Sequence, residues 1–411
     1  MKVVIAGYGV EGQASYRYWR SKAEVTIADE RQRIDSPEGV ATVLGAEAFS
    51  KLDDFDLIIR SPGVSPAKLP YQNKVWSATN EFFYQCRQKN LPIVGVTGTK
   101  GKGTTSSLIT SMLRAANLNV HLLGNIGRPA LDVIDEIQSG DVVVYELSSF
   151  QLWDLQFSPH VAVVLPIEAD HLDIHSDFND YLAAKSRIAS FQTEDDVMIY
   201  HSINAWSRQI AGSSAANNLI EYPFELGDLV QHLQLPGRHN QENASAAVAA
   251  ARLYVRDETA IARGLEAFSG LDHRLKLVGE YNGVKYYDDS ISTTPGSAIA
   301  AIKSFDEPKI IILGGSDKGA NYQEIVKLAK QTQTKVIAIG QTGQTIEKQC
   351  RANKVDCRYV GDLQSAVILS SQITQPGQVV LLSPASASFD QYQNYAQRGD
   401  KFIEAVRRLA I

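Results

Sequence analysis

A glycine-rich stretch at residues 93–105, I-V-G-V-T-G-T-K-G-K-G-T-T, could hold the phosphates of a nucleotide. Gly98, Gly101 and Gly103 would let backbone N–H groups converge on anionic oxygens, and Lys102 would neutralise the β- and γ-phosphates. Such a cradle needs a strand before it and a helix after it, and the apolar patterns on both sides supply them. The stretch therefore predicts a triphosphate site, with a plain glycine turn before a buried helix as the alternative.

The loop departs from the strict G-x-x-x-x-G-K-[ST] pattern at two positions. Val96 stands where the first glycine belongs, and Gly103 follows the lysine where a hydroxyl residue is usual. Thr104 or Thr105 must therefore supply any hydroxyl ligand to Mg²⁺.

Acidic side chains and a histidine follow two further predicted strands. Glu146 ends the apolar run at residues 142–145, an arrangement that P-loop proteins use to hold Mg²⁺. His171 follows the strand at residues 161–165 and lies among carboxylates, which suits a divalent cation. The alternatives are a solvated glutamate and a polar loop in which Asp177 caps the next helix.

The N-terminal residues carry another glycine turn, G-Y-G-V-E-G, with Gly7, Gly9 and Gly12. The acidic pair Asp29-Glu30 ends the next strand, so the spacing matches the dinucleotide fingerprint. Any nucleotide diphosphate can occupy such a turn, and nicotinamide is only one of the candidates. The loop S-P-G-V-S at residues 61–65 is either a ligand loop at the same sheet edge or a simple turn.

Two loops near the C-terminus are hydroxyl-rich or cationic, which suits a small anionic substrate. G-G-S-D-K-G contains Lys318, and S-P-A-S-A-S-F-D-Q spans residues 383–391. The segment G-R-H-N-Q-E-N at residues 237–243 either caps a helix or contacts a nucleobase. Lys185 lies on a helix expected at residues 177–191, where a lysine is normally solvated.

These segments predict an α/β fold with three domains. A Rossmann-like domain is expected at residues 1–90, a central P-loop domain at residues 91–271 and a second Rossmann-like domain at residues 272–411. A hairpin is expected in the third domain, where Asn282-Gly283 separates two strands. The chain of 411 residues is long enough for several such cores.

Composition narrows the class of protein. The apolar share of 44% is typical of a soluble globular protein, and the net charge of −6 without basic clusters argues against a general nucleic-acid binder. No apolar run approaches a membrane span and the N-terminus reads as a strand, so a cytoplasmic location is expected. The three cysteines have neither disulfide nor zinc spacing. No Ser-His-Asp or Cys-His arrangement shows in the local sequence, which argues against acyl-enzyme chemistry.

An ATP cradle combined with separate substrate loops favours one reaction class. In that class a carboxylate is activated by phosphorylation and then attacked by an amine. Two other classes stay open. The N-terminal turn would suit an NAD(P)-dependent oxidoreductase, and the cradle alone would suit a nucleotide-gated binding module without chemistry.

At these motifs the chain resembles the Mur ligases, over essentially all 411 residues. The motifs are G-T-K-G-K-G-T-T, G-N-I-G, E-L-S-S-F-Q-L, D-H-L-D, H-N-x-x-N, D-D-S-I-S-T-T-P and L-L-S-P-A-S-A-S-F-D-Q-Y, in this order. The resemblance implies a ligase that uses ATP to add D-glutamate to UDP-N-acetylmuramoyl-L-alanine through an acyl phosphate. This reaction belongs to cytoplasmic peptidoglycan precursor synthesis. Another Mur-type or folylpolyglutamate-type ligase is the alternative.

The resemblance also implies where the sugar nucleotide binds. Its uridine diphosphate would use the N-terminal turn in place of a dinucleotide, and Asn125 and His171 resemble residues near the muramoyl-alanine end. The residues implied in this site are Gly9, Val10, Glu11, Gly12, Asp29, Glu30, Ser61, Pro62, Gly63, Asn125 and His171.

For ATP, the resemblance implies a site with two Mg²⁺ ions. The implied ATP-binding residues are Gly98, Thr99, Lys100, Gly101, Lys102, Gly103, Thr104, Thr105, Asn243, Arg274 and Asp289. The implied catalytic residues are Lys102, Glu146, His171 and Lys185, and the implied metal ligands are Thr104, Glu146, His171 and Lys185. Lys185 matches a family lysine that CO₂ carbamylates, which would turn a cation into a carboxylate-like ligand.

For the amino acid, Thr293, Lys318, Ser388 and Tyr395 resemble the D-glutamate site. Three positions depart from the family pattern, namely Gly103, Ile291 and Tyr395, and they affect fine contacts to metal and glutamate. Because D- and L-glutamate carry the same groups, the residues do not fix the stereochemistry. The implied partners are the two substrates and ATP, without nucleic acid or membrane, and a monomer is expected.

Overall fold

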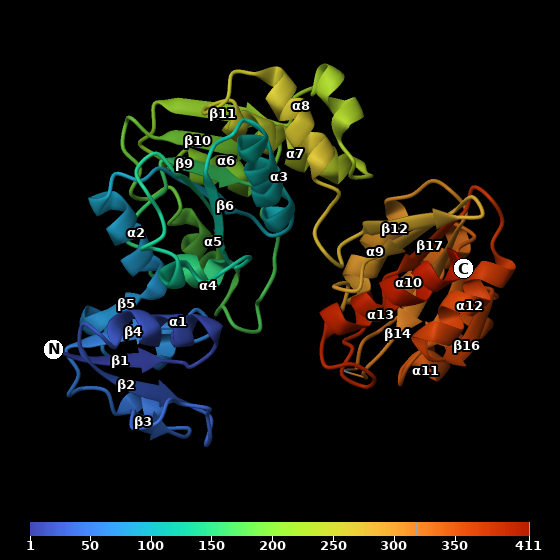
Figure 1. The fold of residues 1–411 in the computed structure, drawn as a ribbon. Coiled ribbons are helices and arrows are strands. Elements are labelled where there is room, and N and C mark those ends of the chain that lie inside the picture. The colour runs from blue at the N-terminus through green and yellow to red at the C-terminus, as the bar shows by residue number, and fades with distance from the viewer. Residues whose placement is uncertain (318, 411) are drawn as a thin grey trace. The chain divides into compact units, whose positions relative to one another are not determined.

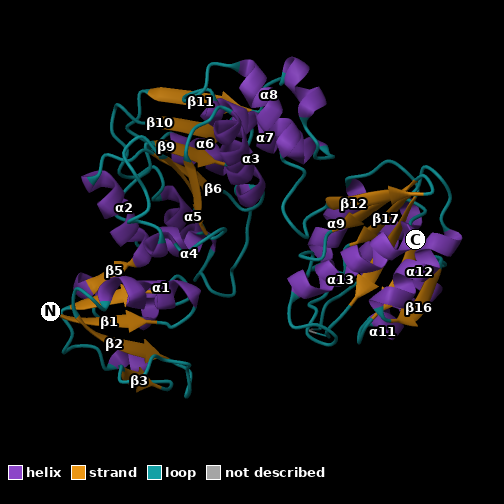
Figure 2. Ribbon diagram, in the orientation of Figure 1, coloured by secondary structure: helices purple, strands orange, loops and turns teal. Residues whose placement is uncertain are grey.

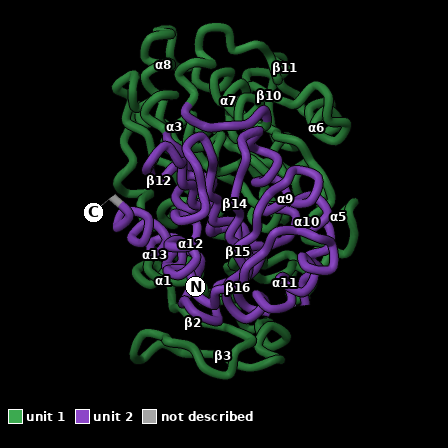
Figure 3. Tube along the Cα trace, turned by 90° about the vertical axis from the view of Figure 1, so that its right-hand side faces the viewer, with its two compact units in different colours: residues 1–233, 239–268 green, residues 234–238, 269–411 purple. Residues whose placement is uncertain are grey.

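Three β-sheets with flanking helices organise the chain (Figures 1 and 2). The computed structural model describes residues 1–317 and 319–410. Two compact units contain the sheets: residues 1–233 with 239–268 form the first unit, and residues 234–238 with 269–411 form the second (Figure 3). The predicted α/β class is confirmed, whereas the domain boundaries after residues 90 and 271 stay a prediction.

The first sheet is entirely parallel, with the strand order β3-β2-β1-β4-β5. Val3, Val4 and Ile5 are fully buried, as expected where a parallel sheet is covered on both faces. The strands are β1 (Lys2–Ala6), β2 (Glu24–Asp29), β3 (Ala41–Leu44), β4 (Leu57–Arg60) and β5 (Val75–Ser77). The helices are α1 (Val10–Trp19), η1 (Ala48–Ser50), η2 (Pro66–Lys68) and η3 (Gln72–Lys74). Helix α2 (Ala78–Gln88) follows β5 and packs Phe82 and Phe83 into the core of the second sheet.

Gly12 lets helix α1 begin close to the first sheet. A Cβ at this position would overlap the carbonyl oxygen of Gly7 and press on Ser61 Oγ. The Ser61 hydroxyl donates to that same carbonyl at 2.6 Å. The turn after β1 and the loop after β4 therefore lie against each other at the carboxyl edge of the sheet, where open α/β sheets bind ligands.

The second sheet is also parallel, with the order β11-β10-β9-β6-β8-β7. Its strands are β6 (Ile93–Thr97), β7 (Val120–Gly124), β8 (Val142–Glu146), β9 (Val161–Val164), β10 (Val197–His201) and β11 (Asn218–Tyr222). Its helices are α3 (Lys102–Ala115), α4 (Ser149–Leu152), α5 (Phe178–Ser186), α6 (Ala205–Ala211), α7 (Arg238–Ala251), α8 (Glu258–Ala267), η4 (Ala130–Asp132) and η5 (Gly227–His232). Helix α8 packs on α3, where the Ser111 hydroxyl donates to the Gly264 carbonyl at 2.7 Å.

Helix α5 begins where the sequence predicts and ends early. Asp177 caps it by accepting a hydrogen bond from Asp180 N at 2.9 Å. The expectation that it continues to residue 191 is wrong, because the helix ends at Ser186. Beyond that point the chain tightens into turns in which Ile188 N donates to Lys185 O at 3.2 Å and Ala189 N to Ser186 O at 3.0 Å.

The third sheet has the order β12-β13-β17-β14-β15-β16, and only β12 runs antiparallel. Its strands are β12 (Lys276–Tyr281), β13 (Val284–Asp288), β14 (Lys309–Gly314), β15 (Lys335–Ile339), β16 (Cys357–Gly361) and β17 (Val379–Leu382). Its helices are α9 (Pro295–Lys303), α10 (Gln323–Gln331), α11 (Gly343–Ala352), α12 (Leu363–Ile373), α13 (Tyr395–Arg407) and η6 (Arg408–Ala410).

The predicted hairpin joins β12 to β13. Asn282 and Gly283 have φ angles of 53° and 73°, the positive values that a type I′ turn requires at both central residues. No helix in residues 1–317 and 319–410 combines the length and the apolar character needed to cross a bilayer.

Candidate functional site

The phosphate loop lies between β6 and α3, as predicted. Gly101 caps α3 in the left-handed region with a φ of 85°, and a Cβ there would collide with the side chain of Asn243 from α7. Lys102 is the first residue of α3, and its Nζ lies 3.1 Å from Gly98 O and 3.0 Å from Thr99 O. Asn243, predicted for the ATP site, is thus brought to the loop.

Glu146 lies beside the loop on the neighbouring strand, paired in register with Val96. The side chain is buried, and its Oε1 accepts a hydrogen bond from Asn125 Nδ2 at 3.2 Å. Its Oε2 is buried and has no hydrogen-bond partner among the described residues. A buried carboxylate oxygen without a donor can bind a hard cation, so this position fits Mg²⁺.

Thr104 and Thr105 occupy the first turn of α3, and both are buried. The Thr105 hydroxyl has no hydrogen-bond partner within residues 1–317 and 319–410. The first turn of α3 therefore contains two hydroxyl groups directly after Gly103, which has no side-chain oxygen. Lys100, by contrast, is exposed to solvent.

Lys185 is buried beneath the phosphate loop, and the expectation of a solvated surface lysine is wrong. Its side chain is 1% exposed, and its Nζ donates to Gly98 O at 2.8 Å and to Thr97 Oγ1 at 3.3 Å. Burial lowers the pKa of Lys185 well below its usual value, and the nearby charge of Lys102 lowers it further. The local sequence around Lys185 gave no sign of this environment.

His171 lies in the loop after β9 with a φ of 54°, in the left-handed region that few histidines adopt. Its ring is half exposed and meets the edge of Phe150, with 5.0 Å between ring centroids. Among the described residues no three His, Cys, Asp or Glu side chains converge on one point. The predicted ligands Glu146 and His171 therefore belong to no such cluster among the described residues.

Ser149, His175 and Asp180, which come from separate segments, form a chain of hydrogen bonds next to Phe150. His175 Nε2 lies 3.0 Å from Ser149 Oγ, and its Nδ1 lies 3.0 Å from Asp180 Oδ2. The local sequence does not show this Ser-His-Asp arrangement because folding brings α4 and α5 together. Ser149 and His175 are only 3% and 2% exposed, so the arrangement fastens α4 to α5 and does not present a nucleophile to solvent.

A cavity of about 490 Å³ is formed by loops of the first and second sheets. The loops follow β1, β2 and β4 on one wall and β7 and β8 on the other, so every wall lies at a carboxyl strand end. The predicted sugar-nucleotide residues that line it are Gly9, Val10, Glu11, Asp29, Glu30, Ser61, Pro62, Gly63 and Asn125. Gly12 and His171 do not line it.

Asp29 already has a cationic partner within this cavity. Arg31 donates from Nε to Asp29 Oδ1 and from Nη2 to Asp29 Oδ2, both at 2.8 Å, and Tyr8 N also donates to Asp29 Oδ2 at 2.8 Å. The hydrogen bond from Arg31 is the main cause that lowers the pKa of Asp29 to about 2. These bonds give Asp29 a cationic partner at the end of β2, and its role in nucleotide binding stays a prediction.

Among the described carboxyl groups that line the cavity, Glu11 is the one whose pKa is strongly raised. Burial raises the pKa of Glu11 to about 7, and a hydrogen bond from Gln151 Nε2 at 3.4 Å only partly opposes this. Gln151 itself belongs to the capping box of α4 with Ser148. Glu11 therefore connects the N-terminal turn to the segment that follows Glu146.

In the second unit, the loops after β13 and β17 contain two of the residues predicted to bind D-glutamate, Thr293 and Ser388. Ser388 is buried, Thr293 is partly buried, and Tyr395 is 40% exposed at the start of α13. Buried Arg398 joins these loops by donating to Ser290 O at 2.8 Å and to Ser386 O at 3.0 Å. Lys318 lies outside the described residues.

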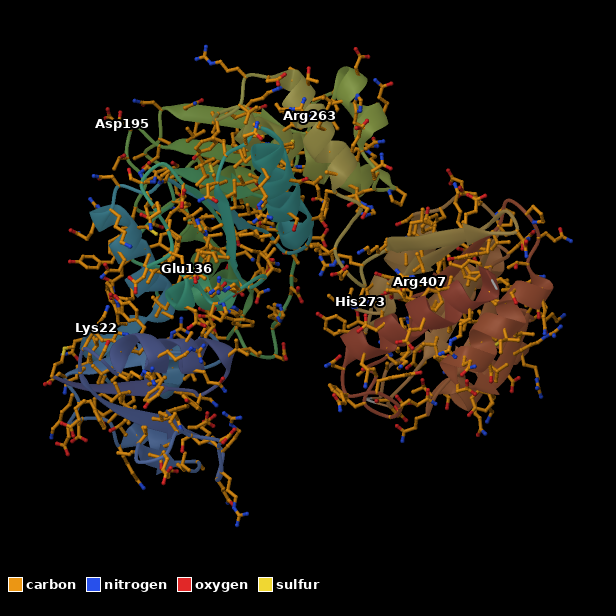
Figure 4. All side chains as sticks on the ribbon, in the orientation of Figure 1. Lys22, Glu136, Asp195, Arg263, His273 and Arg407 are labelled. Carbon is orange, nitrogen blue, oxygen red and sulfur yellow. The ribbon has the colours of Figure 1, made fainter. Side chains whose placement is uncertain are left out.

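Asp289 and Arg274, predicted for the ATP site, also belong to the second unit. Asp289 accepts hydrogen bonds from Ser383 Oγ at 2.7 Å and from Leu275 N at 3.2 Å. Burial raises the pKa of Asp289 to about 7, which the charge of Arg274 opposes only weakly. Figure 4 labels His273 in the second unit. His273 Nδ1 lies 2.7 Å from Asp288 Oδ2, and the His273 ring meets the Tyr395 ring edge-on.

Several residues of these sites were missed at the level of sequence. Arg31 follows the acidic pair directly, and Arg60 is a charged residue at the end of an apolar strand, so both had a visible signal. Gln151 lies inside the E-L-S-S-F-Q-L motif but its contact to Glu11 spans 140 positions. Arg398 had no local signal, because its partners lie in loops far away in the chain.

Two family descriptions match the chain: residues 96–228 match the Mur ligase middle domain, and residues 273–386 match the glutamate ligase domain of Mur ligases. Among solved structures, a UDP-N-acetylmuramate–alanine ligase from Thermotoga maritima superimposes with a TM-score of 0.62 over 99% of both chains, at 18% identity. A folylpolyglutamate synthase from Mycobacterium tuberculosis gives a TM-score of 0.58 over 80% of this chain and 93% of its own, at 13% identity. At these identities the similarity shows the fold alone.

Two relatives found by sequence share a higher identity with this chain than these solved structures do. The UDP-N-acetylmuramoylalanine–D-glutamate ligase of Streptococcus equi subsp. zooepidemicus is 33% identical over 99% of this chain and 97% of its own. The enzyme of the same name from Symbiobacterium thermophilum is 33% identical over 100% of this chain and 98% of its own. The chain therefore belongs to the Mur ligase family, among its UDP-N-acetylmuramoylalanine–D-glutamate ligases.

Proposed function

We propose that the protein uses ATP to join D-glutamate to UDP-N-acetylmuramoyl-L-alanine during peptidoglycan precursor synthesis. One observation carries the proposal beyond family membership. Asn125 lines the nucleotide-sized cavity and also hydrogen-bonds Glu146 beside the phosphate loop. A substrate anchored in the cavity would thus end next to the γ-phosphate of a nucleotide held by the loop.

The first step is transfer of the γ-phosphoryl group of ATP to the alanyl carboxylate. A carboxylate oxygen forms a bond to phosphorus, the bond to the β–γ bridging oxygen breaks, and ADP leaves. Lys102 and the N–H groups at the start of α3 would bind the phosphate oxygens. Thr104, Glu146 and His171 would hold Mg²⁺, which when bound offsets negative charge on the transferring group.

The second step is amide formation. The amine of D-glutamate attacks the carbonyl carbon of the acyl phosphate, inorganic phosphate leaves with the C–O bond pair, and the nitrogen loses a proton. Thr293, Ser388 and Tyr395 would bind the amino acid, with Lys318 as a further candidate. Closing the site around the acyl phosphate would protect it from hydrolysis.

Lys185 is proposed to react with CO₂ to form a carbamate. Its buried environment supports this, because a lowered pKa increases the share of neutral, nucleophilic amine. The carbamate would add two oxygens at the floor of the loop and supply the second metal position. Incubation with ¹³C-bicarbonate should give a carbamate carbon resonance in the wild type and none in Lys185→Met.

The protein would act in the cytoplasm as a monomer, with the two substrates and ATP as its partners and without nucleic acid or membrane. The first unit would contain two domains that meet near residue 90, and the third domain would begin near residue 272.

A coupled assay for ADP tests the proposed reaction. The protein is supplied with ATP, Mg²⁺ and UDP-N-acetylmuramoyl-L-alanine, and D- or L-glutamate is added separately. ADP release that depends on D-glutamate and the sugar nucleotide together is expected. Release that needs neither substrate, or none at all with both present, would refute the reaction; equal rates with L-glutamate would refute the stereochemical assignment.

A further inference from the structure

Arg60 is a fully buried arginine at the end of β4, and the reaction proposed above gives it no role. Its Nε and Nη2 donate to both carboxylate oxygens of Asp154, at 2.7 Å and 2.8 Å. Nη2 also donates to Phe150 O at 2.8 Å, and Nη1 donates to Val64 O at 2.9 Å. The guanidinium is therefore held in a fork geometry that a lysine could not reproduce.

Two of these partners, Val64 and Phe150, line the 490 Å³ cavity, whereas Asp154 does not. Val64 closes the loop after β4, which lines one wall together with Ser61, Pro62 and Gly63. Phe150 lines the other wall with Ser148 and Gln151. Arg60 does not line the cavity itself, yet it is hydrogen-bonded to the main chain of both walls.

We propose that Arg60, paired with Asp154, is a positioning residue that fixes the spacing between the two walls of the sugar-nucleotide cavity. This inference rests on the proposed function for the identity of the ligand. The two walls come from different sheets, so no continuous β-ladder sets their distance. A rigid, planar ion pair with carbonyl contacts on each side can set it.

A second ion pair allows this role to be separated from simple attachment of the two sheets. Arg17 on α1 donates to Asp132 in η4 at 2.8 Å and 2.6 Å, so it also connects the first sheet's helices to the second sheet's segments. Its side chain is 47% exposed, and neither Arg17 nor Asp132 lines the cavity. Arg17→Lys is therefore the matched control for Arg60→Lys.

The experiment measures KM for the sugar nucleotide and for ATP, and the Kd for UDP by calorimetry, in the full-length protein. Arg60→Lys should raise both KM for the sugar nucleotide and Kd for UDP by about tenfold or more, because charge-assisted bonds to both walls are lost. KM for ATP should stay within about twofold of the wild type. Arg17→Lys should leave all three values within about twofold.

Two outcomes would overturn the positioning role. One is an unchanged KM and Kd in Arg60→Lys; the other is an equal rise in KM for ATP, which would indicate general damage. If Arg60→Lys does not fold, Arg60→Met combined with Asp154→Leu replaces the buried pair with apolar groups and should fold while binding UDP weakly. Wild-type-like UDP binding in that variant would also refute the role. An inactive wild type that still binds UDP refutes the reaction only, and the Kd comparison still decides the inference.

Discussion

Glu11 places an ionisable carboxyl in the cavity where the proposed substrate carries its diphosphate. Since the pKa of Glu11 is raised to about 7, the group is mostly neutral at pH 6 and mostly charged at pH 8. A charged Glu11 would repel the diphosphate, so affinity for UDP should fall as pH rises through this range. In Glu11→Gln the fall should be smaller by several-fold.

Calorimetric titration of UDP at pH 6, 7 and 8 measures this effect. UDP itself titrates in this range, so the quantity to compare is the difference between the wild type and Glu11→Gln. Parallel pH profiles for the two proteins would contradict the assignment of the pH dependence to Glu11.

Asp289 should make the second unit less stable at neutral pH than at acidic pH. Its pKa is raised from 3.8 to about 7, so the folded state binds more protons than the unfolded state between these values. The contribution is therefore favourable below pH 3.8 and is lost as pH rises, by up to roughly 4 kcal/mol at pH 7 and above. Asp289→Asn should remove this loss.

Urea unfolding of the wild type and Asp289→Asn at pH 5 and pH 8 measures the difference. Relative to the wild type, the Asn variant should gain stability on going from pH 5 to pH 8. A stability difference that does not change with pH would show that Asp289 is not a buried, protonated carboxyl in the folded protein.

Lys102 should be needed for turnover and dispensable for folding. Its Nζ donates to Gly98 O at 3.1 Å and to Thr99 O at 3.0 Å, and both carbonyl groups lie in the phosphate loop. Lys102→Ala should lower kcat by a factor on the order of 10² or more, as expected when a charge on the transferring phosphoryl group is no longer stabilised. A coupled ADP assay and a thermal unfolding curve measure the two effects, and near-normal turnover would exclude Lys102 from phosphoryl transfer.

For single residues, the sequence predicts the position correctly where the signal is local. The placement of Gly101, Lys102 and Glu146 could be predicted because strand, loop and helix follow one another in the chain. The burial of Lys185 could not, because it depends on the loop of another strand passing over α5. The pairing of Asp29 with Arg31, two residues further on, could not be predicted from the spacing of the glycine turn and the acidic pair.

At the scale of elements, the join between α4 and α5 should contribute substantially to the stability of the first unit. His175 makes hydrogen bonds to both helices, and its ring stacks on Phe150 with 5.5 Å between centroids. His175→Ala should lower the free energy of unfolding by roughly 2–4 kcal/mol, because it creates a cavity and leaves Ser149 unpaired.

His175→Phe provides the matched variant. It keeps an aromatic ring in the stack and removes both hydrogen bonds. Its free energy of unfolding should therefore lie between those of the wild type and the Ala variant. Urea denaturation followed by circular dichroism gives the values. A Phe variant as stable as the wild type would mean that packing alone joins the helices.

Elements were predictable to different degrees for physical reasons. Asn282-Gly283 predicts the hairpin because few residue pairs tolerate positive φ at both positions. The end of α5 was not predictable, since neither glycine nor proline follows Ser186 and the chain continues in tight turns. The Ser149–His175–Asp180 contact arises only when α4 and α5 pack together.

At the scale of the whole molecule, the two units should respond separately to a nucleotide. The described cavity belongs to the first unit alone, so UDP should stabilise that unit and leave the second unit unaffected. At one hundred times its Kd, UDP should add about 2.7 kcal/mol to the stability of the first unit.

Hydrogen exchange with and without UDP distinguishes the units. Slower exchange is expected in peptides from β1, β4 and β8, and no change in peptides from β14 and β17. Equal protection in both units would show that they unfold as one cooperative body.

The chain passes between the units more than once, because residues 234–238 belong to the second unit while residues 239–268 return to the first. During synthesis on a ribosome, α3 would emerge long before α8, its packing partner, and a short piece of the second unit would emerge between them. The first unit would therefore stay incomplete until residue 268 has left the exit tunnel. Translation that stops earlier would release a nascent chain with an uncovered face of α3, a target for chaperones and proteases.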